Sequence, residues 1–276
     1  MRRTRLLQSV ALHAVITLGA LLFLMPIFWM LLSATKPNHV ILSLPPSFAI
    51  GDALGANWAN LTNDLPFLRN VGNSIGISVI YTIVATLVCA MGGYALAKFQ
   101  FAGRAAIFTL ILVALTIPFE VRIIPQYILI ARDLGLSNTW WAIILPGLAN
   151  ALGMFFMRQN MLSVPSELLE AARIDGASEW RIFYAVVLPI MQPALAAVGI
   201  LLLLFQWNDF LWPVLVLTAR DAYTIPVALG TLVGLTRVSW GGIMVGTAIA
   251  TVPFLIMFLF MQRYFVAGIT AGAVKD

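Results

Sequence analysis

Charged residues are scarce in this chain: Asp, Glu, Lys and Arg together make up 10% of its 276 residues. Soluble domains carry about 25%. Hydrophobic residues account for 61% of the sequence. This composition excludes an ordinary soluble protein and indicates a polytopic membrane protein. Because a spanning helix needs about 20 apolar residues, the chain can hold several spans within one transmembrane domain.

Metal ligands and catalytic groups are also sparse. The single cysteine, Cys89, cannot form an intrachain disulfide, and the two histidines, His13 and His39, are isolated. No Cys/His cluster has the spacing of a metal site. The phosphate-loop pattern G-x-x-x-x-G-K-[ST] is missing, so we do not expect this polypeptide to hydrolyse ATP. No Ser/His/Asp or paired-carboxylate arrangement indicates an enzyme, and we expect no catalytic residue, metal or cofactor in this chain.

Hydrophobic runs predict an all-α membrane fold with six transmembrane helices. The runs cover residues 6–32, 71–97, 105–118, 139–157, 186–217 and 243–261. The first run follows three arginines, as in a signal peptide. It is longer than the roughly 7 to 15 residues of a signal-peptide apolar region, so we predict an uncleaved span. Prolines in and beside the fifth run predict a kinked helix.

Polar segments separate these runs. Residues 35–70 contain several prolines and asparagines and are predicted to form a loop with at most short helical turns. Residues 120–138 are too polar to span and are predicted to form a surface or re-entrant segment. Residues 218–242 are predicted to form another polar loop. We therefore divide the chain into an N-terminal helix with an extracytoplasmic loop, residues 1–70, and a transmembrane core, residues 71–276.

The distribution of Lys and Arg predicts the orientation, and the net charge of +5 is read through it rather than as a sign of nucleic-acid binding. With six spans both termini lie on one side. Ten cations fall on that side and six on the other: Arg2, Arg3, Arg5, Lys98, Arg104, Arg158, Arg173, Arg181, Arg263 and Lys275 against Lys36, Arg69, Arg122, Arg132, Arg220 and Arg237. The positive-inside rule then places both termini, and the connection between the fourth and fifth spans, in the cytoplasm.

The most charged stretch of the chain lies in that connection, from Pro165 to Pro189. Pro165 suits the first turn of a helix, and acidic residues follow it where the helix dipole favours negative charge. We predict a short helix from Ser166 to Asp175, stopped at Gly176. Ser178 is placed to cap a second helix that begins at Glu179.

The first of these helices can present a narrow face of small residues. Leu168, Ala171, Ala172 and Asp175 recur at spacings of three and four, which puts them on one side. An amphipathic helix lying on the membrane surface is the alternative. The segment has few cations and no deep apolar face, so contact with a protein fits it better than contact with lipid.

This stretch resembles the cytoplasmic signature of permease subunits of binding-protein-dependent ABC importers. That signature reads Glu-Ala-Ala, three residues, Gly, nine residues, Ile-x-Leu-Pro. The chain has Glu170-Ala171-Ala172, then Gly176, then Val186-Val187-Leu188-Pro189, with Val in place of Ile. The resemblance implies a coupling helix at about residues 165–176 that docks on an ATPase subunit. The implied contact residues are Glu167, Leu168, Glu170, Ala171, Ala172, Asp175, Gly176, Leu188 and Pro189.

Three further stretches are similar to the second permease of the maltose and glycerol-3-phosphate type of carbohydrate importer: residues 70–74 (NVGNS), 207–213 (WNDFLWP) and 262–275 (QRYFVAGITAGAVK). The resemblance implies a sugar-like substrate and a multi-pass subunit of the inner (plasma) membrane bilayer. Its implied partners are a homologous permease, two ATPase subunits that bind ATP and Mg, and an extracytoplasmic substrate-binding protein. The tail is implied to reach toward the ATPase dimer.

Polar and aromatic residues inside the fifth run are candidates for the translocation pathway. An ionised carboxylate at the membrane centre costs about 2.5–3.5 kcal/mol, so Asp209 is expected to face the bundle interior or a water-filled cavity. A structural role beside a neighbouring helix or freed backbone is an equal alternative. Trp207, Asn208 and Trp212 flank it, and both tryptophans could stack on sugars or simply pack.

The main alternative function is a secondary transporter or channel driven by an ion gradient. Such a protein needs ionisable groups facing inward from several spans, and here only Asp209 and His13 qualify. The sequence does not identify the transported solute.

Overall fold

The structure is a computed structural model that describes residues 2–233 and 238–273. The predicted all-α fold is confirmed: the described residues form helices and contain no β-strand, apart from one isolated bridge between Val233 and Val238. The longer helices are α1 (Arg2–Ala34), α3 (Leu54–Asp64), α4 (Phe67–Lys98), α5 (Arg104–Thr116), α8 (Ala151–Met161), α12 (Gln192–Asn208) and α15 (Trp240–Ala273). The tail motif, residues 262–275, lies outside the part whose side chains are described.

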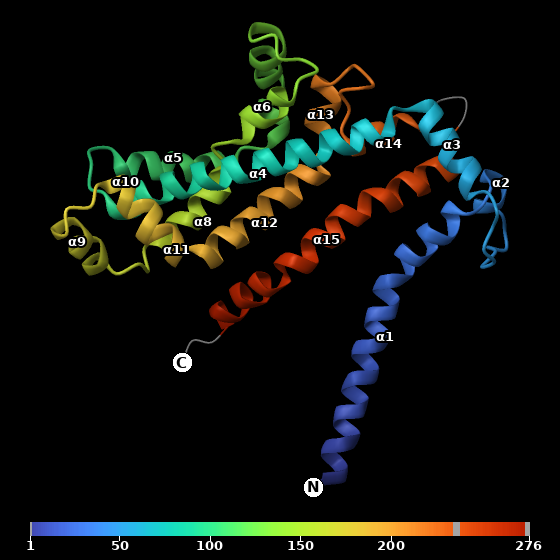
Figure 1. The fold of residues 1–276 in the computed structure, drawn as a ribbon, viewed down its shortest axis with the longest axis horizontal. Coiled ribbons are helices and arrows are strands. Elements are labelled where there is room, and N and C mark those ends of the chain that lie inside the picture. Colours follow the sequence, from blue (N-terminus) through green and yellow to red (C-terminus); the bar gives the residue numbers. More distant parts are fainter. Residues whose placement is uncertain (1, 234–237, 274–276) are drawn as a thin grey trace. The chain divides into compact units, whose positions relative to one another are not determined.

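The described chain divides into two compact units. One comprises Met1–Leu68 and Ala228–Phe254, and the other comprises Arg69–Val227 and Leu255–Asp276. In the second unit α8 packs against both α5 and α12. Figure 1 shows α4 running along these three helices, with α9 (Ser166–Ile174) and α10 (Glu179–Ile182) at the end where α4 finishes.

Two described helices, Ser9–Ala34 and Phe67–Lys98, are long and apolar enough to cross a membrane as single rods. Three bent pairs meet the same test when each is taken as one span: α5 with residues 119–133 (101°), residues 140–147 with α8 (44°), and residues 179–190 with α12 (82°). Among the described residues this gives up to five spans, with Trp240–Ile256 as a shorter apolar helix. The count of six stays a prediction.

Two of the polar segments contain more helix than predicted. The prediction of only short helical turns in residues 35–70 is wrong, because α3 has 11 residues. This helix is polar in composition but has one buried face. Leu61 on that face is fully buried, and Asn57 Nδ2 donates to the carbonyls of Ala34 and Lys36 at 2.9 Å each. Tertiary contacts therefore outweigh weak local propensity here. The predicted loop 218–242 likewise contains α14 (Ile225–Thr231) and the start of α15.

Breaks interrupt the predicted fourth and fifth spans, and a sharp turn follows the third. Residues 120–138 contain α6 (Phe119–Tyr127) and a π-helical segment (Ile128–Asp133), and the 101° turn before α6 agrees with a re-entrant course. The fourth span divides into α7 (Trp140–Ile144), a short 3₁₀ turn (Leu145–Gly147) and α8. The fifth bends at Met191 and stops at Asp209 before α13 (Leu211–Val216), so the predicted kink is confirmed.

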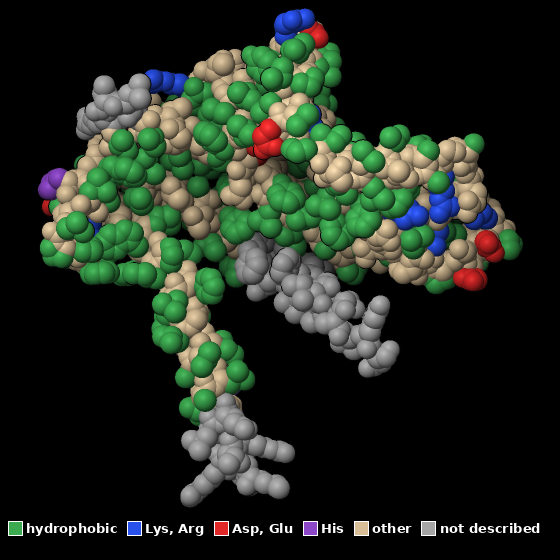
Figure 2. Space-filling view, turned by 180° about the vertical axis from the view of Figure 1, so that it is seen from behind, with side chains coloured by type: hydrophobic (Ala, Val, Ile, Leu, Met, Phe, Trp, Pro, Cys, Tyr) green, Lys and Arg blue, Asp and Glu red, His purple; other side chains and the backbone are tan. Residues whose placement is uncertain are grey.

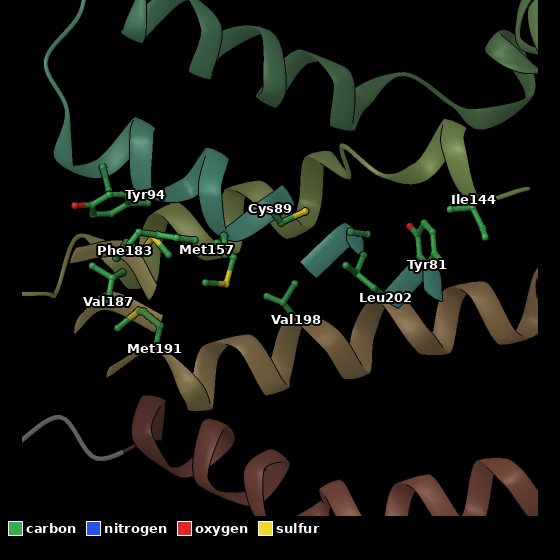
Figure 3. Packing of buried hydrophobic residues seen from close by; sticks show 14 of the residues in the cluster. Tyr81, Cys89, Tyr94, Ile144, Met157, Phe183, Val187, Met191, Val198 and Leu202 are labelled. Atoms are coloured by element: carbon green, nitrogen blue, oxygen red, sulfur yellow. The ribbon is translucent and has the colours of Figure 1, made fainter. Parts of the chain in front are cut away.

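The core of the second unit forms where α4, α8 and α12 meet. Figure 3 shows Tyr94, Phe183 and Val187 at one end of this core and Tyr81 and Ile144 toward the other. Gly92 and Gly93 allow α4 and α8 to pack closely in this core. A Cβ on Gly93 would lie 2.7 Å from Met157 Cβ and 2.8 Å from Arg158 N.

Candidate coupling site

We call residues 165–182, which comprise α9, the turn after it and α10, the coupling element. Pro165 lies at the N-cap of α9, one residue before the position predicted for it. At the other end the Ala177 N–H donates to Ala172 O and the Gly176 N–H to Arg173 O, both at 3.0 Å, which is the Schellman arrangement. Gly176 has φ +78°, and a Cβ there would touch nothing within 4 Å. The turn therefore needs glycine for its backbone conformation rather than for space.

One leucine anchors α9 to the core. Leu169 is 2% exposed and belongs to the buried cluster, whereas its neighbour Leu168 is 46% exposed. On the predicted face of small residues, Ala171 and Asp175 are exposed with Leu168, and Ala172 is half-buried. That face is thus largely open for contact, and Leu169 is the residue that the sequence reasoning missed.

An ion pair connects the two helices of the coupling element. Arg173 Nε donates to Glu179 Oε1 at 2.6 Å and Nη2 donates to Oε2 at 3.4 Å. Because of this hydrogen bond the pKa of Glu179 lies below its usual range. The predicted cap is also present: Ser178 Oγ accepts from the Arg181 N–H at 3.3 Å. The two helices are therefore held together mainly by polar contacts in a half-exposed position.

The end of α4 contacts the chain just before α9 and just after it. Before α9, Lys98 Nζ donates to Val164 O at 2.5 Å. After α9, Tyr94 OH donates to Glu179 Oε2 at 3.4 Å. Two separate hydrogen bonds thus join the last two turns of α4 to the residues that precede and follow α9.

A small apolar hollow of about 260 Å³ lies between the end of α4 and α10. It is lined by Met91, Tyr94, Ala95, Phe99, Glu179, Trp180 and Phe183. Trp180 is 67% exposed, and Tyr184, one turn later, is 60% exposed. The surface beside α9 thus presents two large aromatic side chains as well as small residues.

The signature residues Leu188 and Pro189 lie beyond the coupling element. A π-helical segment, Phe183–Val187, leads into α11 (Leu188–Ile190), and the chain turns by 82° before α12. Pro189 and Pro193 flank this turn, and the missing proline N–H groups explain why the helix is interrupted there. Leu188 packs partly against the core, while Pro189 is exposed.

The four pathway candidates do not lie in one helix as predicted. Asp209 is not inside a helix but in the interruption between α12 and α13, where its Oδ1 accepts from the Trp212 N–H at 3.4 Å. Trp212 is 3% exposed and donates from Nε1 to Ala142 O at 2.9 Å. Trp207 is half-buried, and Asn208 is exposed with Nδ2 donating to Leu204 O. The contacts give Asp209 and Trp212 structural partners, and the pathway role stays a prediction.

Comparison with known sequences identifies the family of this chain. Residues 82–271, well over half of the chain, match the family described as "Binding-protein-dependent transport system inner membrane component". The chain belongs to this family. It is therefore the membrane permease subunit of a binding-protein-dependent ABC importer and not an enzyme. This decides against a transporter driven by an ion gradient.

Two relatives match the permease along nearly its whole length. The lactose transport system permease protein LacG of Rhizobium radiobacter is 34% identical over 98% of each chain. The arabinooligosaccharides transport system permease protein AraQ of Bacillus subtilis is 36% identical over 93% of this chain and 92% of the relative. Among solved structures, a bacterial ABC transporter involved in the import of the acidic polysaccharide alginate has a similar fold, with a TM-score of 0.77, 23% identity and 93% and 96% of the two chains covered.

The opposite end of α4 carries a polar network in the permease. Asn70 Nδ2 donates to the carbonyls of Arg220 and Tyr223, and Asn73 Nδ2 to those of Asp221 and Tyr223, all at 2.9–3.1 Å. Ser74 Oγ accepts from the Ile225 N–H at 2.7 Å. We call these three side chains and the backbone of residues 220–225 the amide network. It explains why the NVGNS stretch carries polar residues at the start of an apolar helix.

Proposed function

We propose that this permease imports a sugar or sugar-like solute and that the coupling element receives the motion of an ATPase subunit. The assembly comprises a homologous second permease, two ATPase subunits that bind ATP and Mg, and an extracytoplasmic substrate-binding protein. Both termini and the coupling element lie in the cytoplasm. Residues 1–70 add a membrane helix and an extracytoplasmic loop to the importer core, residues 71–276.

The relatives support the substrate class. Their names specify lactose and arabinooligosaccharides, and that of a third, 31% identical over 98% of each chain, specifies sn-glycerol-3-phosphate. Each of these solutes carries two or more hydroxyl groups. A polyhydroxylated solute is the common chemistry, and Trp207, Asn208, Asp209 and Trp212 are our candidates for its pathway.

One observation carries the coupling role: Leu168, Ala171 and Asp175 are exposed at α9, and Leu169 is its one buried residue. A short helix with small exposed side chains allows a partner to approach its backbone closely. Glu167 and Glu170 add negative charge, so a cleft lined by cations is the complementary surface. Closure of the ATPases would push α9 and, through Lys98 and Tyr94, the end of α4, in a rigid-body switch of the cavity.

The test uses charge changes on the exposed side of the coupling element. In Glu170→Lys and Gly176→Asp we expect normal insertion and loss of substrate-dependent ATP hydrolysis and uptake. The matched control is Glu120→Lys, which reverses an exposed carboxylate on α6 and should leave coupling unchanged. Both variants would be assayed for uptake in vesicles and for retention of the ATPase during purification. Normal uptake and normal ATPase retention in both would overturn the coupling role.

A further inference from the structure

The loop after α1 combines an apolar surface with an absence of charge. Residues 37–51 contain no Asp, Glu, Lys or Arg. Four large side chains in it are strongly exposed: Leu42 (64%), Leu44 (90%), Phe48 (61%) and Ile50 (81%). Figure 2 shows hydrophobic side chains over this loop and along α1. We call these four side chains the loop patch. A loop in water would not be expected to expose such a patch.

The loop folds back along α1 instead of extending away from it. The rings of Phe48 and Trp29 meet edge to face with centroids 5.5 Å apart. Trp29 lies five residues before the last residue of α1, Ala34, which is about 7.5 Å along the helix axis. Phe48, in the middle of the loop, therefore lies at the same depth as the second-to-last turn of α1, a membrane-spanning helix. Figure 1 shows the loop after α2 (Asn38–Ile41) returning beside the end of α1.

Several contacts fix the loop in this folded-back position. The buried Lys36 donates from Nζ to Ser47 O, and its ammonium lies 4.8 Å from the centroid of the Trp29 ring. The Gly51 N–H donates to Thr35 Oγ1 at 2.9 Å, and the Ala53 N–H donates to Thr35 O at 2.8 Å. Both ends of the loop are thus tied to the chain that leaves α1, so the depth of the patch follows the depth of the helix end.

We propose that the loop patch inserts into the extracytoplasmic interface of the lipid bilayer and fixes the depth of the end of α1. The surface of α1 is already apolar and exposed, with Phe28 at 55% and Leu31 at 52%, and the patch continues this surface beyond the helix. Aromatic rings such as Trp29 and Phe48 and a lysine that places its ammonium beside carbonyl groups are typical of the interface. The occupant that covers the patch is phospholipid, and the headgroup region begins at Lys36.

The test measures depth in liposomes of phosphatidylethanolamine and phosphatidylglycerol that contain brominated lipids. Single cysteines at Leu44→Cys and Ile50→Cys carry an environment-sensitive fluorophore, and both side chains are exposed enough that the label disturbs no packing. The unmodified chain contains only Cys89, which is buried and should not take up the label, so this chain is the blank. Phe23→Cys, 86% exposed in α1, is the deep reference, and Asn60→Cys on α3 is the aqueous control.

We expect shallow bromines to quench positions 44 and 50 more strongly than deep bromines, with the reverse order at position 23 and no quenching at position 60. Aqueous iodide should quench only position 60. Iodide quenching and no bromine quenching at 44 and 50 would overturn the proposal and leave the patch free for a protein partner. Aqueous quenching at position 23 would also overturn it, because α1 would then not define the depth. None of these quenching measurements depends on transport. A failure of the proposed function, which is tested by uptake, can therefore be distinguished from a failure of this proposal.

Discussion

The two ends of α4 are held in opposite ways. At its start, the amide network buries Asn70 (0% exposed), Asn73 (7%) and Ser74 (3%), and each contacts backbone about 150 residues away in sequence. At its end, α9 has one buried residue, Leu169, and is joined to α10 by an ion pair whose side chains are 39% and 43% exposed. A buried, uncharged network resists displacement, whereas a half-exposed pair can break and re-form in water. This difference fits the proposed coupling role, in which the start of α4, the fixed end, stays in place and its other end, the driven end, is moved by the ATPase.

The largest effect is expected at the anchor of the driven end. Leu169→Ala removes a fully packed side chain and should lower stability by about 2–5 kcal/mol. The matched control is Leu168→Ala next to it, which should stay within about 0.5 kcal/mol because that side chain is exposed. Thermal unfolding in detergent and proteolysis at Arg173 and Arg181 measure both. Equal melting curves for the two variants would remove the distinction between anchor and contact face.

The fixed end should be the next most sensitive. Asn73→Ala removes two donated hydrogen bonds and the acceptor for Trp140 Nε1, and it leaves the Asp221 carbonyl without its amide donor. The expected cost is about 1–3 kcal/mol. The control is Asn63→Ala, which changes an exposed asparagine on α3 and should leave the free energy of unfolding unchanged. Because the network carries no charge, the loss should be the same at low and high salt, and a strong salt dependence would contradict this description.

The turn between the two helices should show a smaller, conformational effect. Gly176→Ala places a Cβ at φ +78° in open space, so only backbone strain is added, about 1–2 kcal/mol. Gly176→Asn should recover much of this loss, since asparagine accepts a left-handed backbone more readily. Melting temperatures of the three proteins test the order Gly, Asn, Ala. If Asn were as poor as Ala, the side chain would have to meet something outside this chain.

The ion pair should contribute least to stability. A double-mutant cycle with Arg173→Gln and Glu179→Gln should give a coupling energy of about 0.2–1 kcal/mol, screened by salt. Because folding lowers the pKa of Glu179, the contribution is present above the ordinary carboxyl pKa of about 4.3 and is lost as the pH falls below it. The loss on lowering the pH from about 5 to about 3 should therefore be absent in Glu179→Gln. A coupling energy independent of salt would mean that the pair is less exposed than described.

Local chemistry made the coupling element predictable. The proline at its start, the glycine at its stop and the serine cap each act through neighbouring backbone, and all three predictions agree with the structure to within one residue. Which of two adjacent leucines is buried depends on packing around the helix, so sequence alone did not separate Leu169 from Leu168. Composition predicted helices and breaks, but not the helix α3.

Long-range contacts explain the remaining differences. The sequence could not show that Asn57 would bond to the end of α1, so residues 54–64 read as loop. Nor could it show that the indole of Trp212 donates to the Ala142 carbonyl, 70 residues away. A polar residue in an apolar run is equally compatible with a pathway and with a structural hydrogen bond. Only the position of its hydrogen-bond partner distinguishes these two roles.

The continuity of α4 has a mechanical consequence. Its 32 residues form one helix about 48 Å long, with the amide network on its first turns and the coupling element on its last. With one end fixed, a tilt of about 5° would displace the other end by about 4 Å, roughly three quarters of the pitch of a helical turn. Under the proposed coupling role, the helix would pivot about Asn70 and Asn73. In that role, a push of side-chain dimensions at Lys98 and Tyr94 would change the angle of α4.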